Sequence, residues 1–194
     1  AAVAFSSPQA GHVLLAYARQ AIESEFTSSD AVTDVVNRSV MRDEGWLQRP
    51  IGCFVTLRRD GDLRGCVGAI EPEGPLLEEI RRNARAAAFR DPRFAPLTQA
   101  ELPGVRIELS LLTAPEPIVA PTEEAALVAL RVGIDGVALR AGDRHATFLP
   151  QVWRQVATPR DFMRQLKTKA GLPADSWPAD LRVMRYRAQS WSES

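Results

Sequence analysis

Two strand-like runs flank the dipeptide Asp60-Gly61. This pattern constrains the possible fold of the chain more than any other feature of the sequence. Residues 51–58 read IGCFVTLR, with β-branched and aromatic side chains, and residues 61–70 read GDLRGCVGAI. Asp-Gly between two such runs is typical of a tight β-hairpin turn. The sequence therefore predicts one strand over 51–58 and a returning strand directly after the turn.

The same pattern recurs later in the chain. Residues 55–58 read VTLR and precede RDGD, and residues 137–140 read VALR and precede AGDR. Each hairpin is followed by a helical segment and then by another strand-like run. A strand–strand–helix–strand unit used twice predicts an α+β fold with two lobes, a mixed or antiparallel sheet with helices, and an internal duplication.

Apolar periodicity and capping residues predict the remaining elements. Thr122 is a typical N-cap, and Gly171 is a typical C-cap. The helices are expected over 8–26, 30–36, 75–89, 122–130 and 152–170, with a break at Pro159, and further strands over 105–112 and 181–189. We expect residues 8–190 to form a single domain with two lobes, and residues 1–7 to be a disordered or artificial extension.

Composition narrows the class of protein. The 194 residues have a formal net charge of zero, and only two of the 24 basic residues are lysines. A neutral chain lacks the basic surface that nucleic-acid binding needs, and no apolar run is long enough to span a membrane. Two cysteines do not make a secreted disulfide framework, so we expect a cytoplasmic protein without nucleic-acid or membrane partners. The spacing of histidines and cysteines matches no metal site, and no nucleotide-binding motif is present, so no cofactor is expected.

Cys66 is the first candidate for chemistry, and three interpretations are open. It can be a small buried residue on a tight strand, because free cysteine is often buried and inert. It can be a thiolate nucleophile, with Arg64 on the same face of the strand to lower its pKa. Alternatively, the exposed backbone at Gly65 and Gly68 can bind a ligand, because glycine allows a close approach. Whether Cys53 approaches Cys66 across the hairpin is open.

A thiol enzyme also needs a base. His145 begins the second returning strand and is the imidazole that best suits this role, whereas His12 fits a surface position on the first helix. Glu108 interrupts the apolar alternation of residues 105–111, and it can be a solvent-facing carboxylate, a general base or an ion-pair partner of Arg64 or Arg93.

Further residues suit an anionic ligand. Arg93 and Phe94 belong to the sequence RDPRF, which offers a charged and aromatic rim, although Asp91 can equally form a local cap or salt bridge there. Gln151 lies at an expected helix start, where backbone donors favour anions.

Six motifs in order resemble the AMMECR-type domain family. They are GCFVTL at 52–57, LRGCVG at 63–68, AAAFRDPRFAPL at 86–97, ELSLLT at 108–113, TFLPQV at 147–152 and KAGLP at 169–173. The resemblance covers residues 10–190, and the hexapeptide at 63–68 is similar to the hallmark of the family. It implies a mixed α+β domain with two lobes, a cleft between them and the hallmark near that cleft.

The resemblance also implies partners. Prokaryotic members of this family are often encoded beside a MEMO-type protein and a radical SAM protein, and the family has no assigned activity. Many members carry a Leu-Cys pair before the KAGL motif, where this chain has Leu166 and Lys167. A mechanism that needs this second thiol is therefore in doubt here.

Two functions remain open at the level of the sequence. One is a cysteine-dependent enzyme, or enzyme subunit, that acts on a small anionic substrate at an inter-lobe cleft. The other is a non-catalytic binding or scaffold partner of MEMO-type and radical SAM proteins.

Overall fold

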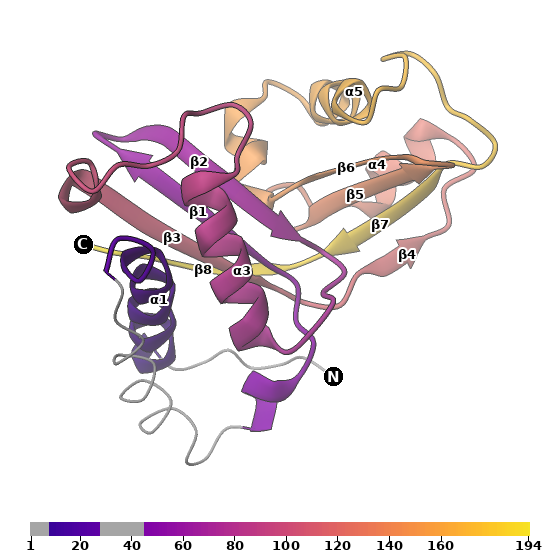
Figure 1. Ribbon diagram of the computed structural model, residues 1–194. Coiled ribbons are helices and arrows are strands. Elements are labelled where there is room, and N and C mark those ends of the chain that lie inside the picture. Colours follow the sequence, from indigo (N-terminus) through magenta and orange to yellow (C-terminus); the bar gives the residue numbers. More distant parts are fainter. Residues whose placement is uncertain (1–7, 28–44) are drawn as a thin grey trace. The chain divides into compact units, whose positions relative to one another are not determined.

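The computed structural model describes residues 8–27 and 45–194, which form two compact units. The first unit contains the described residues up to Leu112 together with Gln189–Ser194, and the second is Thr113–Ala188. Each unit contains one four-stranded sheet (Figure 1). The fold is therefore α+β, with two antiparallel sheets.

The sheet of the first unit has the order β2-β1-β3-β8. Its strands are β1 (Cys53–Arg59), β2 (Asp62–Ala69), β3 (Val105–Leu112) and β8 (Ala188–Ser192). Asp60 and Gly61 have φ angles of 53° and 88°. Two positive φ values in a two-residue loop define the turn that matches the twist of a hairpin, so the expected turn is confirmed.

Two helices cover one face of this sheet. They are α1 (Pro8–Glu23), which packs on β3, and α3 (Leu76–Phe89), which packs on β1 and β2; Figure 1 shows the two helices side by side. The expected apolar face of α3 is buried, from Leu76 to Ala88. Because inward-facing side chains alternate along a strand, Val55 and Leu57 of β1 complete this core with no exposed surface. Two short 3-10 helices, η2 (Gly45–Gln48) and η3 (Leu102–Gly104), lie in the connections.

The second unit has the sheet order β4-β7-β5-β6. Its strands are β4 (Glu116–Ile118), β5 (Gly136–Ala141), β6 (Arg144–Phe148) and β7 (Arg182–Tyr186), and its helices are α4 (Glu123–Ala129), the 3-10 helix η4 (Pro150–Gln155) and α5 (Pro159–Lys169). The expected caps are present. The Thr122 hydroxyl accepts a hydrogen bond from Ala125 N at 3.2 Å, and Gly171 ends the α5 region with a φ of 75°. Pro159 begins α5, which explains the break in the expected helix.

The two units repeat the same topology, as the sequence predicts. In both, a hairpin, a helix and a third strand occur in the order strand–strand–helix–strand, and the first strand lies between the second and the third. The strand register agrees as well, because Arg58 pairs with Arg106 and Arg140 pairs with Arg182. The short identity between VTLR and VALR therefore marks equivalent positions of the two hairpins.

Three expectations differ from the structure or lie outside it. Residues 181–189 do not form one strand: the chain leaves β7 at Tyr186 and enters β8 at Ala188, which belongs to the other sheet. In addition, β4 was not predicted from the sequence, because it is only three residues long. The expected helix over 30–36 and the expected extension over 1–7 lie outside the described residues. Among the described helices, none is long and apolar enough to cross a membrane.

Candidate functional site

Cys66 lies on β2, an edge strand of the first sheet, and two charged side chains hold its backbone. Its N–H donates a hydrogen bond to Asp91 Oδ2 at 2.9 Å, and its carbonyl oxygen accepts one from Arg93 Nη2 at 3.3 Å. These groups would otherwise stay unpaired, because β2 has no neighbouring strand on that side. The loop after α3 thus takes the place of the missing strand.

Asp91 is the centre of this contact. Its carboxylate is buried and forms a bidentate ion pair with Arg93, at 2.9 Å from Nε and 2.7 Å from Nη2, and it also accepts a hydrogen bond from Arg93 N. The bonds from Arg93, followed by the one from Cys66 N, lower the pKa of Asp91 far below its usual range. The local salt bridge that the sequence allowed for Asp91 is therefore the observed one, and Arg93 already has a carboxylate partner.

Arg64 also has a carboxylate partner. Its Nε and Nη2 donate to the two oxygens of Glu101, at 3.1 and 3.2 Å, and its side chain is 13% exposed. Glu101 also accepts hydrogen bonds from Thr98 N and Oγ1 and from Arg59 Nη1, and the bonds from Arg64, followed by those from Thr98, lower the pKa of Glu101 to about 2. The guanidinium groups of Arg64 and Arg93 both lie over the ring of Phe94, at 5.9 and 5.5 Å from its centre.

A β-bulge changes the expected relation between Arg64 and Cys66. Leu57 pairs with Gly65 and Arg58 pairs with Leu63, so Arg64 is an extra residue in β2. Regular alternation of side chains does not hold across a bulge. The expectation that Arg64 and Cys66 share a face therefore stays a prediction, and the two side chains contact different partners, Glu101 and Thr56.

The glycines of the motif are required by close packing. A Cβ atom on Gly65 would lie 2.1 Å from the carbonyl oxygen of Ala87 in α3, and one on Gly68 would lie 2.2 Å from that of Cys53. Gly65 is buried under the helix. Its backbone is not an exposed surface for a ligand, contrary to that interpretation, and its small size lets α3 approach β2.

The thiol of Cys66 is partly exposed and lies in a row of polar side chains. Thr56 pairs with Cys66 on one side and with Glu108 on the other, and its hydroxyl donates a hydrogen bond to Cys66 Sγ at 3.3 Å. Glu108 forms an ion pair with Arg58 at 3.4 Å. The row from Cys66 through Thr56 to Glu108 is the arrangement closest to a reactive site in the first unit.

The second cysteine has a different environment. Cys53 is fully buried and pairs with Ala69 on β2, whereas Cys66 pairs with Thr56 of β1. The three-residue offset from Cys53 to Thr56 places the two thiols on opposite faces of the hairpin, so they do not approach each other, and both are free. Burial raises the pKa of Cys53 to about 12, and Asn83 donates a hydrogen bond to its sulfur.

Two candidate residues belong to the second unit. His145 is exposed on β6, with its Nδ1 3.3 Å from the carbonyl oxygen of Asp143. Gln151 lies in η4, a short 3-10 helix. Their relation to Cys66 stays a prediction.

Two residues with ionic contacts have no distinguishing pattern in the sequence. Glu101 of the first unit resembles other acidic residues of the chain, and Lys167 of the second unit differs only from the family pattern. Lys167 is fully buried, and its Nζ donates to Glu123 Oε2 at 2.5 Å and to the carbonyl oxygen of Ser176 at 3.2 Å. Its ammonium also lies 5.8 Å from the ring centre of Trp177.

Within the described ranges, no three acidic, histidine or cysteine side chains gather in a way that could hold a metal ion.

Comparisons with known proteins agree with the motifs. The model of the AMMECR1 family matches residues 15–191. A protein of Methanothermobacter thermautotrophicus is 36% identical over 195 residues, which is 94% of each chain, and Protein MJ0810 of Methanocaldococcus jannaschii is 38% identical over 146 residues, or 73% of each chain. The crystal structure of the uncharacterized protein PH0010 from Pyrococcus horikoshii has a TM-score of 0.82 at 33% identity, covering 94% of this chain and 91% of that one. The chain belongs to the AMMECR1 family.

Proposed function

We propose that this protein is a non-catalytic binding partner, in which residues 63–68 form a rigid edge of the first sheet. The observation that carries the proposal is the pair of side chains that holds the backbone of Cys66. Both backbone groups of Cys66 are held by Asp91 and Arg93, and Arg64 donates two hydrogen bonds to Glu101, a carboxylate that Arg59 also contacts. A site for an anionic substrate would instead keep such donors available for the substrate.

The partners are proteins of the MEMO type and the radical SAM type, as the family resemblance implies. This part of the proposal is tested by mixing the purified chain with a MEMO-type protein of the same organism and measuring co-elution in size-exclusion chromatography. We expect a stable complex, and Cys66→Ser is expected to bind as tightly as the unchanged protein. Separate elution of the two proteins, or loss of the complex in a folded Cys66→Ser variant, would contradict the proposal.

A second candidate function is thiol chemistry on a small anionic substrate. It is favoured by the hydrogen bond from the Thr56 hydroxyl to Cys66 Sγ, because a donor at the sulfur stabilises a thiolate. Glu108 in the same row would serve as the base. This function requires that Cys66→Ser abolish the activity of the pathway while the protein stays folded and keeps its partners, which is the opposite of the first expectation.

A further inference from the structure

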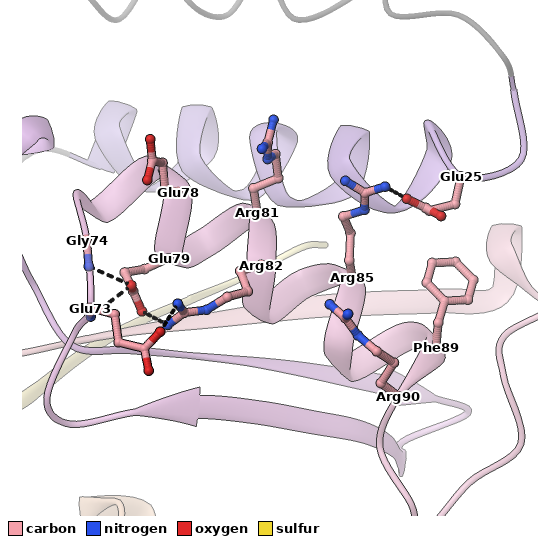
Figure 2. Close-up of a pocket in the computed structure, with 10 residues that line it drawn as sticks. All are labelled: Glu25, Glu73, Gly74, Glu78, Glu79, Arg81, Arg82, Arg85, Phe89 and Arg90. Atoms are coloured by element: carbon pink, nitrogen blue, oxygen red, sulfur yellow. Dashed lines mark hydrogen bonds and ion pairs between the residues drawn. The ribbon is translucent and has the colours of Figure 1, made fainter.

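We infer that the outward face of α3 carries a separate binding site, a groove that takes an acidic segment of a partner protein. The groove has a volume of about 760 Å³ and is lined by four arginines, four glutamates, Gly74 and Phe89 (Figure 2). Small-molecule sites are lined mostly by apolar side chains, whereas this lining is almost entirely charged. The site involves neither Cys66 nor the strand face, so it goes beyond the function proposed above.

The charges are sorted along the helix. The acidic side chains Glu73, Glu78 and Glu79 lie at or before the first turn of α3, and the arginines follow from Arg81 onward. Arg82 belongs to the acidic end, because it forms ion pairs with Glu73 and with the buried Glu79 at 2.7 Å. The other end of the groove has three arginines and one carboxylate, so this end is positive.

Two arginines of the positive end have no ion-pair partner among the described residues. Figure 2 shows Arg81 and Arg90 without a contact to any of the groove's carboxylates, whereas Arg85 contacts Glu25. Arg81 and Arg90 are exposed, so their guanidinium groups can be reached from solvent. In the described part of the chain, an anionic partner would therefore find two guanidinium groups without an ion pair, one on either side of Arg85.

The contact between Arg85 and Glu25 indicates which anion fits. Glu25 comes from the segment after α1, and its carboxylate meets the guanidinium of Arg85 within the groove. Phe26, its neighbour, packs edge-to-face on Phe89 at 5.5 Å. The groove thus already accepts one carboxylate beside an aromatic ring, and arginine suits carboxylates because its donors form a planar fork.

The spacing of the arginines sets the form of the partner segment. Arg81 and Arg90, which directly follows α3, are nine residues apart, a rise of roughly 13 Å along the helix axis at about 1.5 Å per residue, and both side chains line the groove although nine residues make about two and a half turns. An extended chain covers this length in about four residues, at about 3.4 Å per residue. The matching ligand is an extended segment with Asp or Glu at both ends of such a stretch, and not a compact anion.

The test uses the whole chain and a fluorescein-labelled oligoglutamate peptide, with binding followed by fluorescence anisotropy. The formal net charge of the protein is zero, so an acidic peptide is attracted only by a local positive patch. The double variant Arg81→Glu with Arg90→Glu is expected to weaken binding at least about tenfold, because two attractions become repulsions. Its matched control changes the same charge elsewhere, with Arg154→Glu and Arg182→Glu, and is expected to weaken binding less than about twofold.

A second variant tests the same groove in the opposite direction. Glu78→Gln removes a carboxylate from the acidic end and is expected to tighten binding by about twofold. Equal weakening by the two arginine pairs in folded protein, or the absence of measurable binding at low salt, would overturn the inference. Tighter binding of a short RNA or of polyphosphate to the same arginines would overturn the choice of an acidic protein segment. Formation of a dimer that the double variant Arg81→Glu with Arg90→Glu disrupts would also overturn the choice of an acidic segment of a partner protein.

Discussion

The carboxylate of Asp91 holds the backbone N–H of Cys66 at 2.9 Å, and the partner of Asp91, Arg93, holds the carbonyl oxygen of the same residue. Two residues from a loop thus complete the hydrogen bonding of an edge strand. This relationship gives the segment RDPRF, directly after α3, a structural role. The backbone position of Cys66 in the motif at 63–68 depends on Asp91.

Replacing Asp91 with Asn is therefore expected to destabilise the protein by about 2 kcal/mol, because the buried hydrogen bonds to a charged group are lost and Arg93 is left without its partner. Urea denaturation followed by circular dichroism measures this change. Asp62→Asn is the matched control, since Asp62 is exposed on β2, the strand that Asp91 contacts, and it is expected to stay within about 0.5 kcal/mol. Similar values for the two variants would mean that the Asp91 contact adds nothing to stability.

Gly65 tests the close approach of α3 to β2. Gly65→Ala places a methyl group against the carbonyl oxygen of Ala87, which belongs to a helix backbone and cannot turn away, so we expect a loss of about 3 kcal/mol. Gly45→Ala is the control, because a Cβ atom there meets no atom within 4 Å, and it is expected to change stability by less than about 0.5 kcal/mol. If both variants unfold at the same denaturant concentration, the packing argument for Gly65 fails.

Stability is expected to fall in acid through Glu101. Its pKa is lowered from 4.5 to about 2 in the folded protein, chiefly by the hydrogen bond from Arg64. A carboxyl group with a lowered pKa contributes stability that is complete above its unfolded pKa and lost as the pH falls through its folded pKa. The melting temperature should therefore decline between pH 5 and about pH 2. Glu101→Gln should reduce the decline in this window, and an unchanged slope in that variant would rule out this contribution.

The reactivity of the two thiols distinguishes the two proposed functions. Cys53 is buried and its pKa is raised to about 12, so it should resist iodoacetamide at pH 8 in the folded protein. Cys66 is partly exposed and is expected to react no faster than a small free thiol if it is structural. Mass spectrometry of the labelled peptides measures both rates, with Cys66→Ser as the control. A rate for Cys66 about a hundredfold above that of a free thiol would instead support catalysis.

Lys167 is expected to stabilise the second unit through Glu123. Lys167→Met keeps most of the buried volume but leaves Glu123 without its ammonium partner, so we expect a loss of about 2 kcal/mol in chemical denaturation. Adding Glu123→Gln should recover part of this loss, because the unpaired charge is then removed. Strictly additive losses in the double variant would show that the two side chains are not coupled.

The sequence alone determined most of the elements and their order. The Asp60-Gly61 turn, the alternation from Val105 to Leu111 and the cap at Thr122 depend on neighbours along the chain, so local physical rules predicted them. The repeated hairpin was also visible, because equivalent strands retained similar residues, and the cross-strand pairs Arg58–Arg106 and Arg140–Arg182 agree with it.

Only the tertiary structure decided where the last strand ends and which charges meet. Residues 181–189 look like one strand, but Glu193 accepts hydrogen bonds from Arg19 of α1 and Ile107 of β3, and these distant contacts place β8 in the first sheet. In the same way, the bulge at Arg64 and the partners Asp91, Glu101 and Arg58 depend on pairing across the fold. The residue types of the motif are written in the sequence, whereas the partner of each charge is fixed by packing between segments far apart in the chain.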